Sequence, residues 1–547
     1  MAVIARVLAG AVLVGLAGGT VWAGSTLDRA EPTDAPPLTV TTAPEEVAAV
    51  CAAPVQLADP DVAGDPEFGS SPVGTTSGVV ADAAPGAAAL RTLDGEPVTT
   101  PPGDLAAAVP GPTALWSTPA DGVVASAGTA WSVTTDGDLR GLAAAPCQTP
   151  TTEQWLVGGG TELGTSTRLV LQNPHGTPAT VEIEVWGPTG RLELAGPATF
   201  SVPAGGQTST LLEGLAAEQR RLTVRVTSTG AMVASYLQVN SLDGLRPTGV
   251  ELIPAASAPA TRQVVTGLVV DGSEPGAGGA SVRVHVPTDG DPATDGDPAT
   301  DGDPATDGDP ATVDVFLLGP QGRVALPGAE TVDVVPGEVT DLSLAGLPAG
   351  TYTAVLESAV PFLAAGTYPR TDPASGAVDV AHVAAAAPAG SGRLAVPAKA
   401  GVSIALTAVP DDVAALPATV VGVGGGPQPT PDGSAEPEDA AEPEDAAEPD
   451  GLPPTQVTLT FLGAGGATLE TRAVTASAGT VVVAPGPAGT TAVRLDSQPP
   501  AGVLLTWTGN LSTGPGLVSA LPGTESADVT VSVTVAARPD LGLGVDR

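Results

Sequence analysis

The residue types that could carry out chemistry are scarce in this chain of 547 residues and stand far apart. His175 lies in a turn-like NPHG, His285 in a strand-like run and His382 in a linker-like run, and no two are spaced as metal ligands. The segment GTSTR at 164–168 lacks the second glycine of a nucleophile elbow, and the glycines at 158–160 lack the Lys-Ser/Thr of a phosphate loop. We therefore predict no catalytic residue, no metal site and no cofactor, and we expect that the protein is not an enzyme.

Carboxylates form a second group of candidates. Glu182 and Glu184 could resemble the acid pair of a glycosidase, but alternation places both on the solvent face of one strand. Four copies of TDGDPA at 288–311 space carboxylates as calcium loops do. Proline follows every DGD, however, and the twelve-residue calcium pattern is absent. The repeats therefore predict a solvated, disordered tract, with weak calcium binding as the alternative.

Three tryptophans, Trp116, Trp131 and Trp186, could stack on sugar rings as in glycan-binding modules. By parity, Trp186 lies on the polar face of its strand. Leu318 and Leu462 occupy the same register in two related segments, which makes packing the preferred interpretation of Trp186. Glycan contact by the three rings remains the alternative hypothesis.

The chain has two cysteines, Cys51 and Cys147, separated by about 100 residues. In an exported protein an isolated pair predicts a disulfide, and a loop of that length contributes about 4–5 kcal/mol in the chain-entropy model. Two unpaired buried thiols are the alternative. Their spacing excludes a CxxC redox or zinc site.

The elements that must position these residues are strands. The segments VEIEVWGPTGR (181–191), VDVFLLGPQGR (313–323) and VTLTFLGAGGA (457–467) repeat one pattern of alternating apolar residues that leads into a glycine-containing turn. A related phrase at 114–131 indicates a fourth, more divergent unit. The pattern predicts an all-β chain of tandem immunoglobulin-like antiparallel β-sandwich units behind an N-terminal transmembrane or signal segment.

The predicted organisation has six parts, of which the first two are a signal peptide or signal anchor and a flexible stalk. The stalk is rich in proline and threonine, and two acidic insertions interrupt later units. The parts are the signal segment 1–27, the stalk 28–50, a divergent disulfide-closed β unit 51–150, and β-sandwich units at 151–258, 262–370 (disordered insertion 288–312) and 380–538 (disordered insertion 424–454).

Residues 7–27 carry no charge and follow Arg6, which predicts export with the bulk of the chain outside. We expect a single uncleaved N-terminal span in the cell membrane, with a secreted chain as the alternative. Acidic residues outnumber basic ones by 60 to 20, giving a net charge of −40 that argues against nucleic acid as a partner. Aromatic residues make up only 3%, so Val, Leu and Ala must fill the cores.

The stretch at 155–190 opens with Trp-x-x-Gly-Gly-Gly and contains Leu-x-Leu-x-Asn-Pro. It resembles an actinobacterial family of membrane-anchored extracytoplasmic proteins that carries only a domain-of-unknown-function label. The match is strongest between Cys51 and Pro254. The resemblance brings over no catalytic residue, and it implies an envelope location in a GC-rich Gram-positive lineage, beside surface-glycan assembly.

Together these observations predict a noncatalytic cell-envelope protein that acts as an extracytoplasmic scaffold or accessory factor for surface machinery. Its expected partners are an envelope protein or a cell-wall glycan, and the membrane through the N-terminal segment. A cell-wall glycan-binding module and an adhesin-like surface protein are the alternatives.

Overall fold

The computed structural model describes residues 38–57, 74–84, 86–101, 103–272, 279–288, 310–326, 328–421, 452–514 and 516–535. Within these ranges the protein is all-β, as predicted, with mostly antiparallel strands and no α-helix. No helix there has the length and apolar character needed to cross a membrane. The expected signal segment and most of both acidic insertions lie outside the described residues.

The chain divides into two compact units. One combines the segments 1–44 and 529–547, and in it β1 (Leu38–Thr42) pairs with β37 (Val531–Val535). The other, Glu45–Asp528, contains every feature discussed below.

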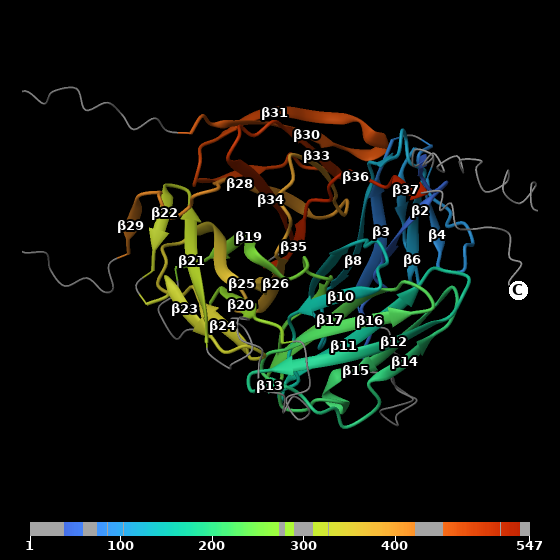
Figure 1. The fold of residues 1–547 in the computed structure, drawn as a ribbon, viewed down its shortest axis with the longest axis horizontal. Coiled ribbons are helices and arrows are strands. Elements are labelled where there is room, and N and C mark those ends of the chain that lie inside the picture. Colours follow the sequence, from blue (N-terminus) through green and yellow to red (C-terminus); the bar gives the residue numbers. More distant parts are fainter. Residues whose placement is uncertain are drawn as a thin grey trace, which may run out of the picture. The chain divides into compact units, whose positions relative to one another are not determined.

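The described strands of Glu45–Asp528 follow the sequence as four sets, coloured blue, green, yellow and orange-red in Figure 1. The first set contains β2 (Val47–Cys51), β3 (Thr75–Asp82), β4 (Ala88–Thr92), β5 (Leu105–Ala107), β6 (Thr113–Ser117), β7 (Val123–Val124), β8 (Ala127–Thr134) and β9 (Gly141–Pro146). The second contains β10 (Glu153–Val157), β11 (Thr165–Asn173), β12 (Ala179–Gly187), β13 (Gly190–Arg191), β14 (Thr199–Val202), β15 (Gly206–Leu211), β16 (Thr223–Thr229), β17 (Ala234–Asp243) and β18 (Arg246–Ile253).

The remaining strands form the third and fourth sets. The third contains β19 (Ala260–Val270), β20 (Ser281–His285), β21 (Ala311–Gly319), β22 (Gly322–Ala325), β23 (Thr331–Val334), β24 (Val339–Ser343), β25 (Gly350–Thr371) and β26 (Val378–Ala384). The fourth contains β27 (Ser391–Ala395), β28 (Gly401–Pro410), β29 (Ala418–Val420), β30 (Thr455–Leu462), β31 (Thr468–Ala476), β32 (Val481–Pro485), β33 (Ala492–Ser497), β34 (Val503–Thr513) and β35 (Leu517–Pro522). A short β36 (Ala527–Asp528) pairs with β7.

One strand order recurs in all four sets. The orders β5-β3-β8-β9, β15-β11-β17-β18, β24-β20-β25-β26 and β32-β28-β34-β35 each place the last strand of the set at the end of a four-strand run. The opposing sheets are β10-β16-β12-β13, β27-β33-β30-β31 and, in the first set, only β2-β6-β4. In the third set the long β25 serves both sheets, pairing with β19 and β21 through its first half and with β20 and β26 through its second.

The repeated phrase forms the expected strands. Strands β12, β21 and β30 alternate buried and exposed residues at their starts, and all three become continuously buried toward their ends. Gly187 pairs with Gly190, and Gly319 with Gly322, across the two Gly-Pro turns. The third copy, which lacks proline, instead turns through a 3₁₀ segment, Ala464–Gly466, and has a register shift at Leu462.

The four last strands, β9, β18, β26 and β35, are here called the central strands. Strand β9 packs beside β18 and β35, and β26 packs beside the same two strands. The four therefore form a closed ring of neighbours, although each belongs to the sheet of its own set. This ring joins the four sets, and it makes the first set a neighbour of the fourth.

Two predicted ranges need correction. The stalk predicted at 28–50 includes most of β2, which pairs with β6. Val50 and Cys51 at the end of this strand are fully buried, because they pack into the core of the first set. The fourth unit was predicted to begin at 380, directly after a third unit at 262–370, but β26 spans Val378–Ala384 and pairs with β25, so it belongs to the third set. The immunoglobulin-like assignment and the remaining domain limits stay predictions.

Candidate functional site

A large cleft lies where the first set meets the fourth. Its volume is about 920 Å³. The first set lines it with β3, β5, the loop before β5 and Trp131 of β8, and the fourth set with the end of β30, the following turn and the start of β33. Most of the lining residues are Ala, Gly or Thr, whose short side chains leave the space between the two walls open. We refer to it as the first–fourth cleft.

Among the described residues that line this cleft, Trp131 is the single aromatic one. It stands opposite Gly78 in the β3–β8 ladder. A Cβ at Gly78 would lie 2.5 Å from the carbonyl oxygen of Ala107 and 3.4 Å from the Trp131 ring, so the missing side chain gives the ring its place. The half-buried ring also packs against the core of the fourth set. Of the three tryptophans proposed from the sequence, Trp131 is therefore the one that meets a cavity.

An ion-pair network forms another part of the wall. Arg494 donates to both carboxylate oxygens of Asp82, at 3.0 and 2.9 Å, and Arg393 donates to Asp82 Oδ2 at 2.7 Å. Asp82 is only 7% exposed, so two guanidinium groups from the fourth set neutralise a nearly buried carboxylate of the first. Farther along, the backbone N–H of Gly465 donates to Asp104 Oδ1. These contacts fix the distance between the two walls.

Trp186 and Trp116 lie elsewhere. Trp186 is 1% exposed and contacts Trp155 and His285, with ring centroids 5.2 and 5.3 Å away, so it has no free face for a sugar. Although parity puts Trp186 on the polar face of β12, the ring is packed, as the preferred interpretation expected, because the third set covers that end of the strand. Trp116 is half-buried in β6, and the Arg91 guanidinium lies 5.3 Å from its ring centre.

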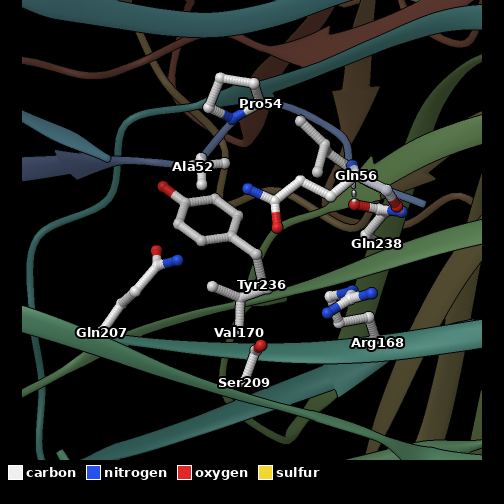
Figure 2. A pocket seen from close by; sticks show the side chains of 11 residues that line it. Ala52, Pro54, Gln56, Arg168, Val170, Gln207, Ser209, Tyr236 and Gln238 are labelled. Carbon is white, nitrogen blue, oxygen red and sulfur yellow. Dashed lines mark hydrogen bonds between the residues drawn. The ribbon is translucent and has the colours of Figure 1, made fainter. Parts of the chain in front are cut away.

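A second cavity, shown in Figure 2, lies between the segment after Cys51 and the β11–β17 sheet. Its volume is about 10 Å³, room for roughly one water molecule. Gln56 and Gln238 close it by exchanging hydrogen bonds of 2.9 and 2.6 Å. The hydroxyl of Tyr236 contacts the carbonyl oxygens of Val50 and Pro146, and burial raises its pKa. This small cavity is a polar packing seam between the first and second sets.

The buried ionisable groups gather at the central strands. Glu251 of β18 accepts hydrogen bonds from the backbone N–H groups of Ala144 and Leu252, both at 3.0 Å. Asp379 of β26 accepts from Leu142 at 3.0 Å and from Val518 at 2.9 Å. Each carboxyl group thus supplies acceptors to backbone donors of neighbouring central strands that lie in other sheets.

Space around these carboxyl groups is tight. A Cβ at Gly141 or at Gly249 would lie 2.7 Å from Asp379 Oδ1, so glycine is required on both neighbouring strands. Asp379 is 0% exposed, and burial raises its pKa to about 7. Burial also raises the pKa of Glu251 well above its usual range. The low dielectric favours the neutral form of each group.

The histidines occupy structural positions. His382, expected in a linker, lies in β26, and its Nε2 is 2.8 Å from the carbonyl oxygen of Val157. His285 Nδ1 is 3.2 Å from the carbonyl oxygen of Glu338. Burial lowers the pKa of both histidines to about 4. His175 lies in a turn capped by Asn173, whose Oδ1 accepts a hydrogen bond from the backbone N–H of His175 at 2.9 Å. Within the described ranges no cluster of three or more His, Cys, Asp or Glu side chains is arranged to hold a metal.

The disulfide prediction is confirmed. Cys51 at the end of β2 is bonded to Cys147 directly after β9. Because 96 positions separate the two cysteines, the bond links the beginning and the end of the first set.

The model of a family of unknown function, DUF5719, matches residues 104–442. The chain belongs to this family. The matched range begins beside the first–fourth cleft, at Asp104, and contains β9, β18 and β26. The resemblance stated from the sequence was strongest between Cys51 and Pro254, whereas the DUF5719 match extends through the third set into the fourth.

No curated protein matches the chain. Among solved structures, a chain of the T13 IBDV viral particle is 11% identical over 72% of this chain and 81% of that chain, with a TM-score of 0.13. The α-L-rhamnosidase of Streptomyces avermitilis, complexed with L-rhamnose, is 10% identical over 80% and 54% of the two chains, with a TM-score of 0.12. These TM-scores are too low to support any argument about this DUF5719 protein.

Proposed function

We propose that this protein is a noncatalytic component of the cell envelope, anchored by its N-terminal segment, that serves as a scaffold or accessory factor for surface machinery. The observation that supports this most directly is the use of its buried carboxyl groups. Glu251 and Asp379 accept hydrogen bonds from backbone donors of other strand sets. A buried acid whose carboxyl oxygen accepts hydrogen bonds from neighbouring strands holds those strands together, and a scaffold needs such rigidity.

Further contacts between sets support the same proposal. Arg283 of the third set donates to the carbonyl oxygen of Gly159 in the second set at 2.8 Å. Arg262 of the third set donates to the carbonyl oxygen of Pro410 in the fourth at 2.7 Å. Thr129 of the first donates to the carbonyl oxygen of Ala395 in the fourth at 2.8 Å. Side chains that bind the backbone of a neighbouring set oppose hinge motion, so the sets would present their surfaces to a partner in fixed positions.

The test is to isolate the full chain, carrying an affinity tag, from detergent-solubilised envelope with its glycans intact. Mass spectrometry and sugar analysis then identify what accompanies it. A matched control is the Gly249→Leu variant, in which the new side chain would displace Asp379 and loosen the central strands. The scaffold proposal expects a specific envelope protein with the native chain and much less of it with the variant.

Recovery of no envelope protein, or of equal amounts with both chains, would contradict the scaffold function. Binding to foreign surfaces in preference to the cell's own envelope would favour the adhesin-like alternative instead. A polysaccharide recovered without protein would favour a glycan-binding module, for which the first–fourth cleft and Trp131 supply a specific site.

A further inference from the structure

We propose that the first–fourth cleft binds an uncharged glycan, with one sugar ring stacked on Trp131. This goes beyond the scaffold function, because a soluble sugar can be bound without any partner protein. The inference rests on the size of the cleft, the exposure of one aromatic ring, and the balance of charges around it.

The size of the cleft fits a ligand of a few sugar rings. Its volume of about 920 Å³ is at the upper end of the range of small-molecule sites, about 300–1,000 Å³. The seam between the second and third sets, in contrast, is filled by the rings of Trp155, Trp186 and His285. Of these two seams, the one between the first and fourth sets is open, so joining two sets does not by itself leave a cleft.

Trp131 provides a stacking surface. Its ring is held against β3 because Gly78 has no side chain, and it is half-buried, with part of its surface lining the cleft. No hydrogen bond of its indole N–H to a described residue is present, whereas the buried indole N–H groups of Trp116, Trp186 and Trp507 are enclosed by protein. An aromatic face beside an available N–H suits a sugar, which presents apolar C–H faces and hydroxyl edges.

The polar groups of the lining match hydroxyl groups. Thr76, Ser77 and Thr100 offer side-chain hydroxyls that can both donate and accept. The hydroxyl of Thr491 donates to the carbonyl oxygen of Leu462 at 3.4 Å and can still accept. Asp104 adds a carboxylate that is only partly occupied by Gly465. Such groups are placed along both walls, which suits a ligand with hydroxyls along its length.

The charges favour a neutral ligand over an anionic polymer. Within the part of the lining that the structure describes, Arg494 is the only cation, and it is paired with Asp82, as is Arg393 behind it. Asp82 and Asp104 balance these two cations, so no net positive charge is left to hold phosphate or carboxylate. The net charge of −40 on the whole chain further repels polyanions.

The experiment measures binding of neutral oligosaccharides to the purified full chain by titration calorimetry and tryptophan fluorescence. The probes are short oligomers of glucose, mannose, galactose and arabinose, with a polygalacturonate fragment as the charged comparison. We expect at least one neutral oligomer to bind, and Trp131→Ala to weaken it about tenfold. Trp131→Phe, which keeps a ring, should retain most of the affinity.

Matched variants separate loss of the site from loss of the fold. Ala464→Phe places a large side chain in the cleft from an exposed turn position and should reduce binding without disturbing the core. Ala467→Phe makes the same change three residues later, outside the lining, and should leave binding intact. Trp116→Ala removes a half-buried ring elsewhere in the first set and should also leave it intact.

Three results would overturn the proposal. The first is that no neutral oligomer binds the native chain. The second is that Ala464→Phe and Trp131→Ala bind a neutral oligomer as tightly as the native chain does. The third is that only polygalacturonate binds. A failed envelope pull-down combined with positive sugar titrations would leave this site standing and remove the scaffold function, so the two proposals fail separately.

Discussion

Two interfaces between sets, here called seams, are alike at their edges and different inside. One joins the second and third sets, and the other joins the first and fourth. Each has one aspartate held by two arginines: Asp341 by Arg283 and Arg221, and Asp82 by Arg393 and Arg494. The seam between the second and third sets is filled with buried apolar and aromatic side chains, namely Trp155, Val157, Trp186, Val339, Leu363 and Ala365. The other opens into a cleft of about 920 Å³.

The ring of central strands therefore does not require every seam to be filled, because the first–fourth seam stays open while the ring is closed. Leu142 and Ala144 of β9 already pack into the fourth core close to the central strands. The outer part of the first–fourth seam is therefore free to stay open, provided that polar contacts keep its walls apart. The aromatic rings divide accordingly, with Trp155 and Trp186 used for packing and Trp131 left facing a cavity.

The largest expected effect comes from the disulfide, which belongs to the set that forms one wall of the open seam. The opposing sheet of that set has only three strands, so it depends most on a covalent link. Replacing Cys51 and Cys147 by serine should lower the free energy of unfolding by about 4–5 kcal/mol. Urea unfolding measures the change in this free energy. A decrease below about 1 kcal/mol would show that non-covalent contacts, and not the disulfide, hold the first set at the open seam.

The filled seam should respond most strongly to Trp186→Ala. Deleting a fully buried tryptophan leaves a cavity and costs about 3–5 kcal/mol. Trp116→Ala, the matched control, removes a half-buried ring and should cost clearly less. Urea unfolding gives the free energy of unfolding of both variants. Equal decreases would mean that the aromatic cluster is not what distinguishes the filled seam.

The central strands serve both seams, and Asp379 makes their stability depend on pH. Its pKa rises from an ordinary value of about 4 to about 7 on folding, so the folded state favours the protonated form. This contribution is complete below about pH 4 and is lost as pH rises toward 7, by up to about 4 kcal/mol. Asp379→Asn should remove this part of the pH dependence, while the part due to Glu251, whose pKa is also raised, remains.

Histidines act in the opposite direction. The pKa values of His285 and His382 fall to about 4, so their contributions are lost as pH falls from about 6.5 toward 4. The test is therefore the difference in thermal stability between the native chain and Asp379→Asn at each pH. A difference that stays constant from pH 4 to 7.5 would contradict the role assigned to Asp379.

The smallest effect concerns the two arginine-held aspartates. Asp82→Ala leaves two guanidinium groups without their carboxylate at the open seam and should cost about 1–3 kcal/mol, reduced because both arginines are partly exposed. Asp341→Ala should cost less, because Asp341 is itself more exposed and apolar packing supports its seam. Urea unfolding measures the decrease in the free energy of unfolding for each variant. A larger decrease for Asp341→Ala than for Asp82→Ala would show that the polar contacts do not hold the cleft open.

Much of the local structure was predictable from the sequence. Alternation placed Val181, Ile183 and Val185 in the core, and the Gly-Pro turns formed where expected. The cysteine pair predicted its own bond. These features depend on residues close in sequence or on simple pairing, and so a pattern of period two or a count of cysteines was sufficient.

The central strands were not predictable in the same way. The run VDVAHVA, which forms β26, looks like a linker in the sequence. Nothing near Asp379 in the sequence indicates that its carboxyl group accepts hydrogen bonds from Leu142 and Val518. A signal was present, since Gly141 and Gly249 each open a short, mainly apolar run that ends in proline, the second one interrupted by Glu251. The meaning of this signal depends on strands far apart in the chain.

The sequence by itself determined an all-β chain, the register of its repeated strands, one disulfide and a strongly acidic surface. Only the tertiary structure decided which tryptophan packs and which faces a cavity. The physical reason is that period-two alternation assigns a side chain to one face of a sheet but does not say what covers that face. For Trp186 the third set covers it, and for Trp131 the fourth set packs against part of the ring and leaves a cleft beside it.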